Sequence, residues 1–497
     1  MLLRSLRNCW RALRGLVLAW FRSSQRRSAS LSNPAEAAID RTRRSIQFAV
    51  DRLHAQTYAR AQESFPGDHA GPRKWLALIT GLLDTAAAYI AESQQPGKSA
   101  AETLSLVNDA SQIAHLAYQL LNLMGGAGLD ELPYCIVAPL QRWFDDLGID
   151  NSTFFRAELV INYELRPFDQ GTFKGIRNPT QSLSLAINEI TWPLLRVTVP
   201  SKAFGIIPHF AIVAHELGHA LAEKIVWDQT KFASFSTDLV NRISSRLNMS
   251  PLTPSVLKKG QEVFLSWTAE LTADAFCFFI AGPAAFFSLS ELLAIVGGDG
   301  LTQTHPAAAL RRQTLFDRMS MGSTSFSDLF YKHTGQVLST EFVSSTIKAP
   351  PPADQLFVQV VQNTKDSELA AVLTEMNEAL PSTISAIYEH VESFLKANYP
   401  SSIYTPGQFD ADLNTHLQAL LSAIPPIESG ITLKERKATT FTCIINVGWC
   451  ALLTKLSDLR VKIEGPDPLN TKKLECLHSL LLKSVELSEV RRTWETV

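Results

Sequence analysis

Apolar residues recur at helical spacing along most of the chain. In the first third, Ile39, Ile46, Val50 and Leu53 fall on one face of a helix, because the steps between them are seven, four and three residues. The same pattern predicts helices over residues 34–65, 74–93, 101–124 and 136–147. We therefore expect a helical domain over residues 34–150.

The amino-acid composition changes at Thr153, where β-branched and aromatic residues become frequent. The stretches TFFRAELVINYEL and SLSLAINEITWPLLRVTVP have the composition of strands. Proline cannot donate a ladder hydrogen bond, so Pro193 should leave LLRVTV as a strand of its own. A small sheet is thus predicted immediately before the apolar segment of residues 211–221.

A second helical block is predicted after Pro251. The run AFCFFIAGPAAFF should be a buried helix that ends at Gly282-Pro283, and no apolar run reaches the roughly 18 residues of a membrane helix. The Pro-rich APPPAD at 349–354 predicts a further boundary, followed by helices. The expected fold is mainly α with a small β-sheet (α+β). Its predicted segments are a basic amphipathic N-terminal segment at 1–33, a helical domain at 34–150, a core at 151–348 and a helical C-terminal domain at 349–497.

Charge and cysteine content narrow the function. A net charge of -2 argues against a nucleic-acid-binding protein, which needs a basic surface. The six cysteines form no CxxC pair, which suits a reducing compartment such as the cytoplasm.

Residues 1–30 depart from this balance. They contain seven arginines and no acid, with arginines on one helical face and Trp and Leu on the other. This pattern is typical of a helix that makes peripheral contact with an anionic membrane. A segment that targets the chain to an organelle has the same pattern, and a solvated helix packed on its own protein is a third interpretation.

The segment AIVAHELGHAL contains the first candidate chemistry. His215 and His219 lie four residues apart, so a helix places both imidazoles on one face, with Glu216 beside them. This HExxH arrangement is that of zinc hydrolases, although it arises by chance in roughly one such chain in a hundred. Gly218 costs a helix about 1 kcal/mol relative to alanine. A close neighbour at Gly218 would explain its presence.

Zinc needs a third protein ligand, and WTAELTADAF offers one. Glu270 and Asp274 share one face of an otherwise apolar helix, where a metal gives both carboxylates a reason to be present. Glu270 would complete a His-His-Glu site, and Asp274 would accept a hydrogen bond from a ligand imidazole. Weaker alternatives are Glu262 or Asp238 as third ligand and His209 as a fourth, although His209 fits a structural cap better.

HELGH followed by ELTAD resembles the gluzincin clan of zinc metallopeptidases, and within it the CAAX prenyl protease and heat-shock protease family. QTHPAAALRRQTL is similar to a third motif of that family, which borders the active site. The resemblance covers roughly residues 190–320, and the family's transmembrane helices are missing from this sequence. It implies a zincin-like core, His305 as a candidate for steadying the oxyanion, and Arg311 as a residue behind the ligands.

These observations predict a metallopeptidase with one zinc ion per chain and a peptide or protein substrate. Glu216 would act as general base toward a zinc-bound water. The resemblance further implies that LLRVTV pairs with the substrate as an edge strand. Two alternatives remain open: a non-catalytic regulatory protein with structural zinc, and an amidase acting on a small molecule. A structural zinc site has no need of Glu216, which favours the enzyme.

Overall fold

The computed structural model describes most of the chain. The described residues are 34–63, 70–125, 127, 133–149, 154–158, 164–190, 192, 194–200, 207–225, 254–295, 305–338, 367–429 and 436–495, apart from residues 455, 464, 466, 468 and 469. The predictions for residues 1–33, for Asp238 and for the boundary at 349–354 lie outside them. Of the described residues 77% are helical and a few form a small sheet, which confirms the predicted mainly-α class with few strands.

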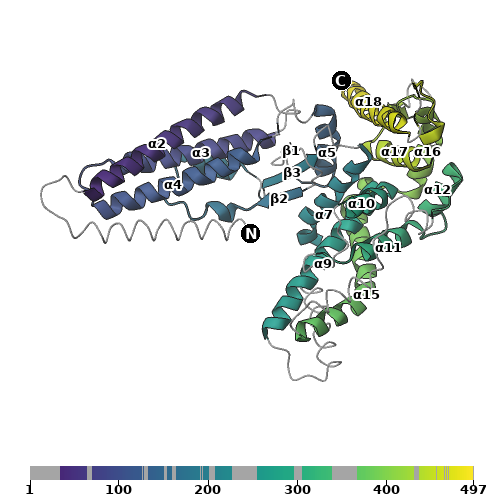
Figure 1. Cartoon of the computed structure of the whole chain (residues 1–497), viewed down its shortest axis with the longest axis horizontal. Coiled ribbons are helices and arrows are strands. Elements are labelled where there is room, and N and C mark those ends of the chain that lie inside the picture. Colours follow the sequence, from purple (N-terminus) through teal and green to yellow (C-terminus); the bar gives the residue numbers. More distant parts are fainter. Residues whose placement is uncertain are drawn as a thin grey trace. The chain divides into compact units, whose positions relative to one another are not determined.

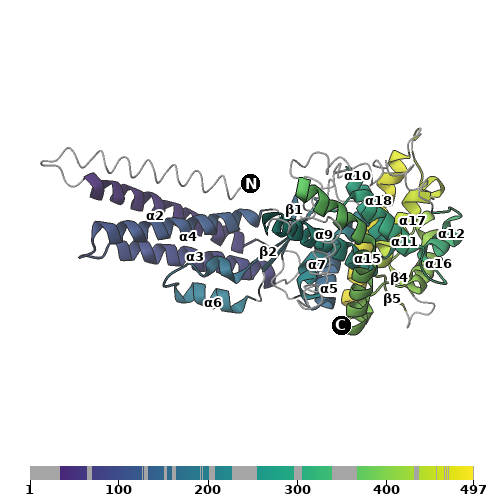
Figure 2. The ribbon, with the colours of Figure 1, turned by 90° about the horizontal axis from the view of Figure 1, so that it is seen from below.

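The chain divides into two compact units, one of residues 1–65, 69–125 and 168–194 and another of the remainder. In the first unit α2 (Pro34–Ala61), α3 (Ala70–Ser93) and α4 (Ala100–Leu123) run side by side (Figures 1 and 2). The start of α4 is fixed by a capping box, in which Ser99 and Glu102 satisfy each other's backbone N–H groups. These helices confirm the predicted ones in this region.

The segment SLSLAINE was expected to be a strand, and that expectation was wrong. It forms the helix α6 (Gln181–Glu189), which follows a single turn of 3-10 helix, η1 (Gln170–Phe173). The Thr180 hydroxyl accepts a hydrogen bond from the Leu183 N–H and so caps the helix. Leu183 and Ala186 are buried one turn apart, and the Leu183 backbone lies so close to Gly81 of α3 that a Cβ there would be 2.6 Å from Leu183 Cα. Capping and packing on α3 therefore override the strand-like composition.

A three-stranded sheet consists of β1 (Phe154–Glu158), β2 (Glu164–Phe168) and β3 (Leu194–Pro200), in the order β1-β3-β2. β1 and β3 are parallel, with Phe155 opposite Val197. LLRVTV therefore forms the central strand, and the expectation that it is an edge strand was wrong. The strand is central because it has a partner on each edge, β1 and β2. Both of its faces are buried as well, since Arg196, Val197, Thr198 and Val199 are all at most 3% exposed.

The second unit holds the remaining described helices. They are α5 (Tyr134–Asp146), η2 (Ile207–Phe210), α7 (Ala211–Ile225), α9 (Pro254–Ala281), α10 (Pro283–Ile295), α11 (Ala308–Met319), α12 (Phe326–Thr334), α15 (Ser367–Asn398), η3 (Pro400–Ser402), α16 (Pro406–Leu421), α17 (Phe441–Thr454), η4 (Leu456–Asp458) and α18 (Thr471–Glu495), with a two-stranded sheet of β4 (Glu428–Ser429) and β5 (Lys437–Ala438). As predicted, α9 stops at Gly282, whose φ of 60° breaks the helix before Pro283 begins α10.

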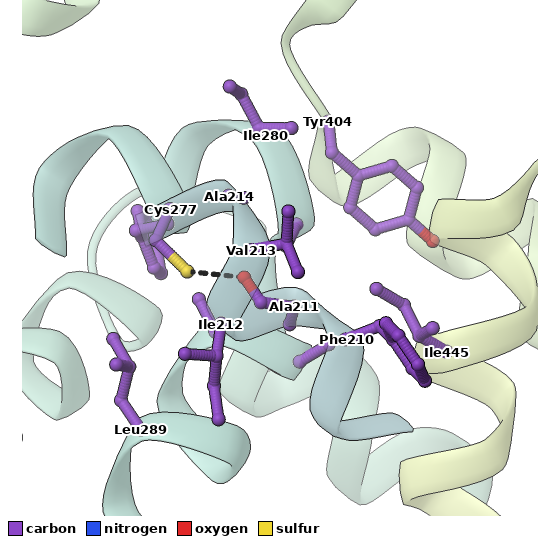
Figure 3. Close-up of a cluster of buried hydrophobic side chains, with 14 of the residues drawn as sticks. Phe210, Ala211, Ile212, Val213, Ala214, Cys277, Ile280, Leu289, Tyr404 and Ile445 are labelled. Carbon is purple, nitrogen blue, oxygen red and sulfur yellow. Dashed lines mark hydrogen bonds between the residues drawn. The ribbon is translucent and has the colours of Figure 1, made fainter. Parts of the chain in front are cut away.

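One hydrophobic core joins the motif helices to the C-terminal helices. Figure 3 shows Val213 of α7 lying among Ile280, Tyr404 and Ile445, which come from three other segments, while Ile212 lies beside Leu289. The Trp449 indole of α17 donates a hydrogen bond to the Pro208 carbonyl at 3.1 Å, just before α7. The predicted boundaries at 150/151 and 348/349 therefore differ from the observed division, in which α5 and α15 to α18 share a unit with α7 and α9.

Two described helical segments, Gly71–Ser93 and Lys258–Ala281, are long and apolar enough to cross a membrane. The sequence analysis had found no such run, because charged residues interrupt both segments. In the apolar windows of these helices, 61% and 78% of the residues are buried inside the structure. Core helices pass the same test, so these segments are weak grounds for a membrane span.

Candidate metal centre

The centre begins with a close approach of two helices. At Gly218 of α7, a Cβ atom would lie 2.6 Å from the Cα of Ala273 and 2.9 Å from the Cβ of Phe276, both on α9. The close neighbour predicted at Gly218 is thus present. Because no side chain separates the two backbones here, the polar groups of α7 and α9 on either side of Gly218 can meet.

His215 and His219 of α7 and Glu270 of α9 form a group that could hold a metal ion. The Nε2 atoms of His215 and His219 are 3.2 Å apart. Glu270 places Oε2 3.5 Å from His215 Nε2 and Oε1 3.4 Å from His219 Nε2. Zinc bonds of about 2.0–2.1 Å in a tetrahedron require ligand atoms roughly 3.3–3.4 Å apart. The pair of imidazole nitrogens matches that edge length. The two Glu270 distances come from different oxygens, and with one ligand atom per residue the three atoms lie within 4.8 Å of one another, so the group could hold a metal ion.

Asp274 and Arg311 stand behind the three candidate ligands. Asp274 Oδ1 lies 3.0 Å from His215 Nδ1, although the ring hydrogen is not aligned with that oxygen. Arg311 of α11 donates to both oxygens of Asp274, from Nε and Nη2, at 2.7 Å each. Its Nη1 lies 3.2 Å from Glu270 Oε2. A buried carboxylate is tolerated only with such partners, so Arg311 allows two acids to face the imidazoles.

This charge arrangement sets the protonation of the metal-free site. Burial opposes the charged form of His215, but Asp274 and Glu270 outweigh it and raise its pKa to about 9. Burial and the neighbouring His215 charge lower the pKa of His219 to about 4. Burial would raise the pKa of Glu270, yet His215 and Arg311 hold it at about 2. The His219 imidazole is therefore neutral and Glu270 ionised at neutral pH, which are the forms that bind a metal.

The centre is buried on one side and accessible on the other. Asp274 and Arg311 are 1% and 4% exposed. The side chain of His219 is 28% exposed, and that of His305 is 51% exposed, with its Nε2 3.3 Å from Glu270 Oε1. Glu216, next to His215 on α7, is partly buried. The structure thus brings together six residues from the three motifs, namely His215, His219, Glu270, Asp274, His305 and Arg311, with His219 and His305 on the open side.

The alternative metal ligands that the sequence suggested lie outside the group of His215, His219 and Glu270. His209 is buried in η2, where its Nε2 lies 2.8 Å from Glu291 Oε2 and its ring stacks on Trp449, as a structural residue would. Glu262 is exposed on α9 and does not join the metal-binding group. Cys277 is buried in the core and donates its S–H to the Ala211 carbonyl at 3.2 Å (Figure 3).

The sequence analysis missed the pairing of Arg311 with Asp274. Arg311 was noted only through the third motif, because no periodic pattern links α11 to α9. A second signal was present in principle: a buried apolar helix with two acids needs a cation as well as a metal.

Comparison with protein families, curated proteins and solved structures finds no match for this chain. The likeness to gluzincins therefore rests on the three motifs alone.

Proposed function

We propose that this protein is a zinc-dependent hydrolase of the gluzincin type that cleaves peptide bonds. The observation that supports this most strongly is the group of His215, His219 and Glu270, whose ligand atoms lie within 4.8 Å of one another on two helices that meet at a glycine. In this proposal His215, His219 and Glu270 hold the ion, and the zincin-like core is the part of the second unit around α7 and α9.

Each remaining group has a task in hydrolysis. When bound, zinc supplies Lewis acidity, which polarises a carbonyl and lowers the pKa of a water molecule. The Glu216 carboxylate takes the proton of the attacking water and passes it to the leaving nitrogen. We assign to His305, whose half-exposed side chain lies 3.3 Å from Glu270 Oε1, a hydrogen bond to the oxyanion of the substrate.

Asp274 and Arg311 keep the ligands oriented. Asp274 contacts the non-ligating nitrogen of His215, which would fix the tautomer that presents Nε2 to the ion. Arg311 holds Asp274 through two hydrogen bonds and also contacts Glu270, so one guanidinium orients two of the acids.

The open side favours catalysis over structural zinc. A structural site is closed by four protein ligands, whereas a catalytic site keeps one position for water or substrate. Among the described residues, three side chains form the group, and the exposure of His219 and His305 leaves an approach. Glu216 beside the ligands has no role in a structural site.

The test is zinc stoichiometry measured together with hydrolysis of an unfolded protein. Wild-type protein should bind one zinc ion and cleave the substrate in a chelator-sensitive way. Glu216→Gln should retain zinc and lose about 10²- to 10⁴-fold in rate, because an amide cannot accept the proton.

Glu262→Gln is the matched control, since Glu262 is an exposed acid on the same helix as Glu270, eight residues before it, and should not affect the rate. Zinc binding without any hydrolysis would favour the regulatory alternative. Hydrolysis unchanged in Glu216→Gln would exclude Glu216 as the base.

A further inference from the structure

A second polar cavity lies in the same unit as the metal centre. It encloses about 230 Å³ between α5, the segment from η3 to α16, the start of α17 and α18. Four charged side chains line it, namely Arg142, Asp146, Asp412 and Arg492. None of them belongs to the candidate metal centre or to its neighbours.

One end of this cavity holds a guanidinium, that of Arg492, which donates to the Thr439 carbonyl but to no carboxylate among the described residues. Arg142 pairs with Glu489, whose carboxylate accepts two hydrogen bonds from the Arg142 guanidinium. Arg492 shares the same carboxylate only at 3.9 Å, and its buried Nε has no hydrogen-bond partner among the described residues. Burial and the charge of Arg142 lower the pKa of Arg492, and the more distant carboxylates of Glu489, Glu495 and Asp146 only partly oppose this. The buried Ser402 hydroxyl, also without a partner in the described part of the chain, lines the same cavity.

Another group in the cavity lacks a cation. Asp412 of α16 accepts a hydrogen bond from the Tyr404 hydroxyl at 2.7 Å. Burial nevertheless raises the pKa of Asp412, because two neutral donors, the Tyr404 hydroxyl and the Cys443 thiol, do not replace the solvation of a carboxylate. A positive charge placed in the cavity would stabilise the ionised form.

We propose that this cavity binds a small zwitterion of the size of a free amino acid, with its carboxylate at Arg492 and its ammonium group at Asp412. A guanidinium is the side chain best suited to a carboxylate, and the Ser402 hydroxyl adds a second donor. The volume lies below the roughly 300–1,000 Å³ of pockets for drug-sized ligands, which favours a ligand of amino-acid size.

The site is separate from the proposed catalytic centre. Ile280 lines the cavity at the end of α9, ten residues after Glu270, which corresponds to about 15 Å along the helix axis. Binding should therefore need neither zinc nor Glu216. The proposal does not depend on the proposed hydrolase.

The experiment screens the twenty free L-amino acids for stabilisation of the full chain against thermal unfolding, with and without a zinc chelator. The best binder is then compared by calorimetry with its N-acetyl and carboxamide derivatives. We expect each blocked derivative to bind at least tenfold more weakly than the zwitterion. This comparison uses wild-type protein, so it holds even where a variant fails to fold.

Two variants assign the charges. Asp412→Asn should bind the zwitterion and its N-acetyl derivative equally, and Arg492→Gln should bind the zwitterion and its carboxamide equally. The matched controls Asp410→Asn and Arg491→Gln alter neighbouring charges on α16 and α18 that do not line the cavity, and they should bind as wild type does. The proposal is overturned if no amino acid binds at a concentration on the order of 10 mM. It is also overturned if blocked and free forms bind equally, or if the control variants lose as much binding as the two test variants.

Discussion

Replacing Gly218 with alanine should separate the two helices that carry the candidate ligands. The added Cβ would lie 2.6 Å from Ala273 Cα and 3.1 Å from Ala273 Cβ, whereas carbon atoms pack at about 3.5–4.0 Å. The first contact is with backbone, which cannot rotate away. We therefore expect α7 and α9 to move apart by roughly 1 Å.

This displacement is large for a metal site and modest for a fold. Overpacking costs about 1–3 kcal/mol, and the better helix propensity of alanine offsets about 1 kcal/mol of it. Metal–ligand distances, in contrast, tolerate only about 0.2 Å. Glu270 should then no longer reach the ion held by His215 and His219, and zinc affinity should fall at least tenfold, or about 1.4 kcal/mol.

Competition titration with a zinc chelator measures the affinity, and thermal melts of the metal-free protein measure the fold separately. Gly407→Ala is the control, because its only neighbour within 4 Å of the new Cβ position is the Thr405 hydroxyl at 4.0 Å. It should leave zinc affinity unchanged. Wild-type zinc affinity in Gly218→Ala would refute the reasoning, since the ligands could not then depend on the close approach at this position.

Three further predictions concern the ligands and the N-terminal segment. Glu270→Ala should lose zinc on dialysis and melt at lower temperature, while Asp274→Asn should bind about 10- to 100-fold more weakly but still fill at saturating zinc; the reverse order of severity would make Asp274 the ligand. Because the pKa of His215 is raised to about 9 in the metal-free site, zinc uptake at pH 7 should release about one proton and tighten as pH rises toward 9. Calorimetry in buffers of different ionisation enthalpy measures this proton, and zero release would contradict it. Deleting residues 1–30 should preserve hydrolysis and weaken binding to anionic vesicles at low salt; equal vesicle binding by both forms would exclude the membrane interpretation.

Features that depend on neighbouring residues could be predicted from the sequence. His215 and His219 share a face because one helical turn places them there, whatever surrounds the helix. The break at Gly282-Pro283 follows from the backbone conformations that these two residues favour. Even the close approach at Gly218 could be anticipated, because a glycine inside an apolar helix needs a reason.

Packing decided the rest. SLSLAINE has the residues of a strand, yet a cap at Thr180 and burial of Leu183 against α3 make it a helix. LLRVTV was correctly predicted as a strand, but its central place in the sheet depends on partners that its own sequence does not encode.

The candidate site shows the same division. The sequence suggested Glu270 and Asp274 as partners of the histidines, but only the crossing of α7 and α9 places Glu270 within 3.5 Å of both imidazoles. The pairing of Asp274 with Arg311 joins α9 to α11 and follows from no local pattern. Contacts between distant segments are set by how whole helices pack, and short-range periodicity contains no information about that packing.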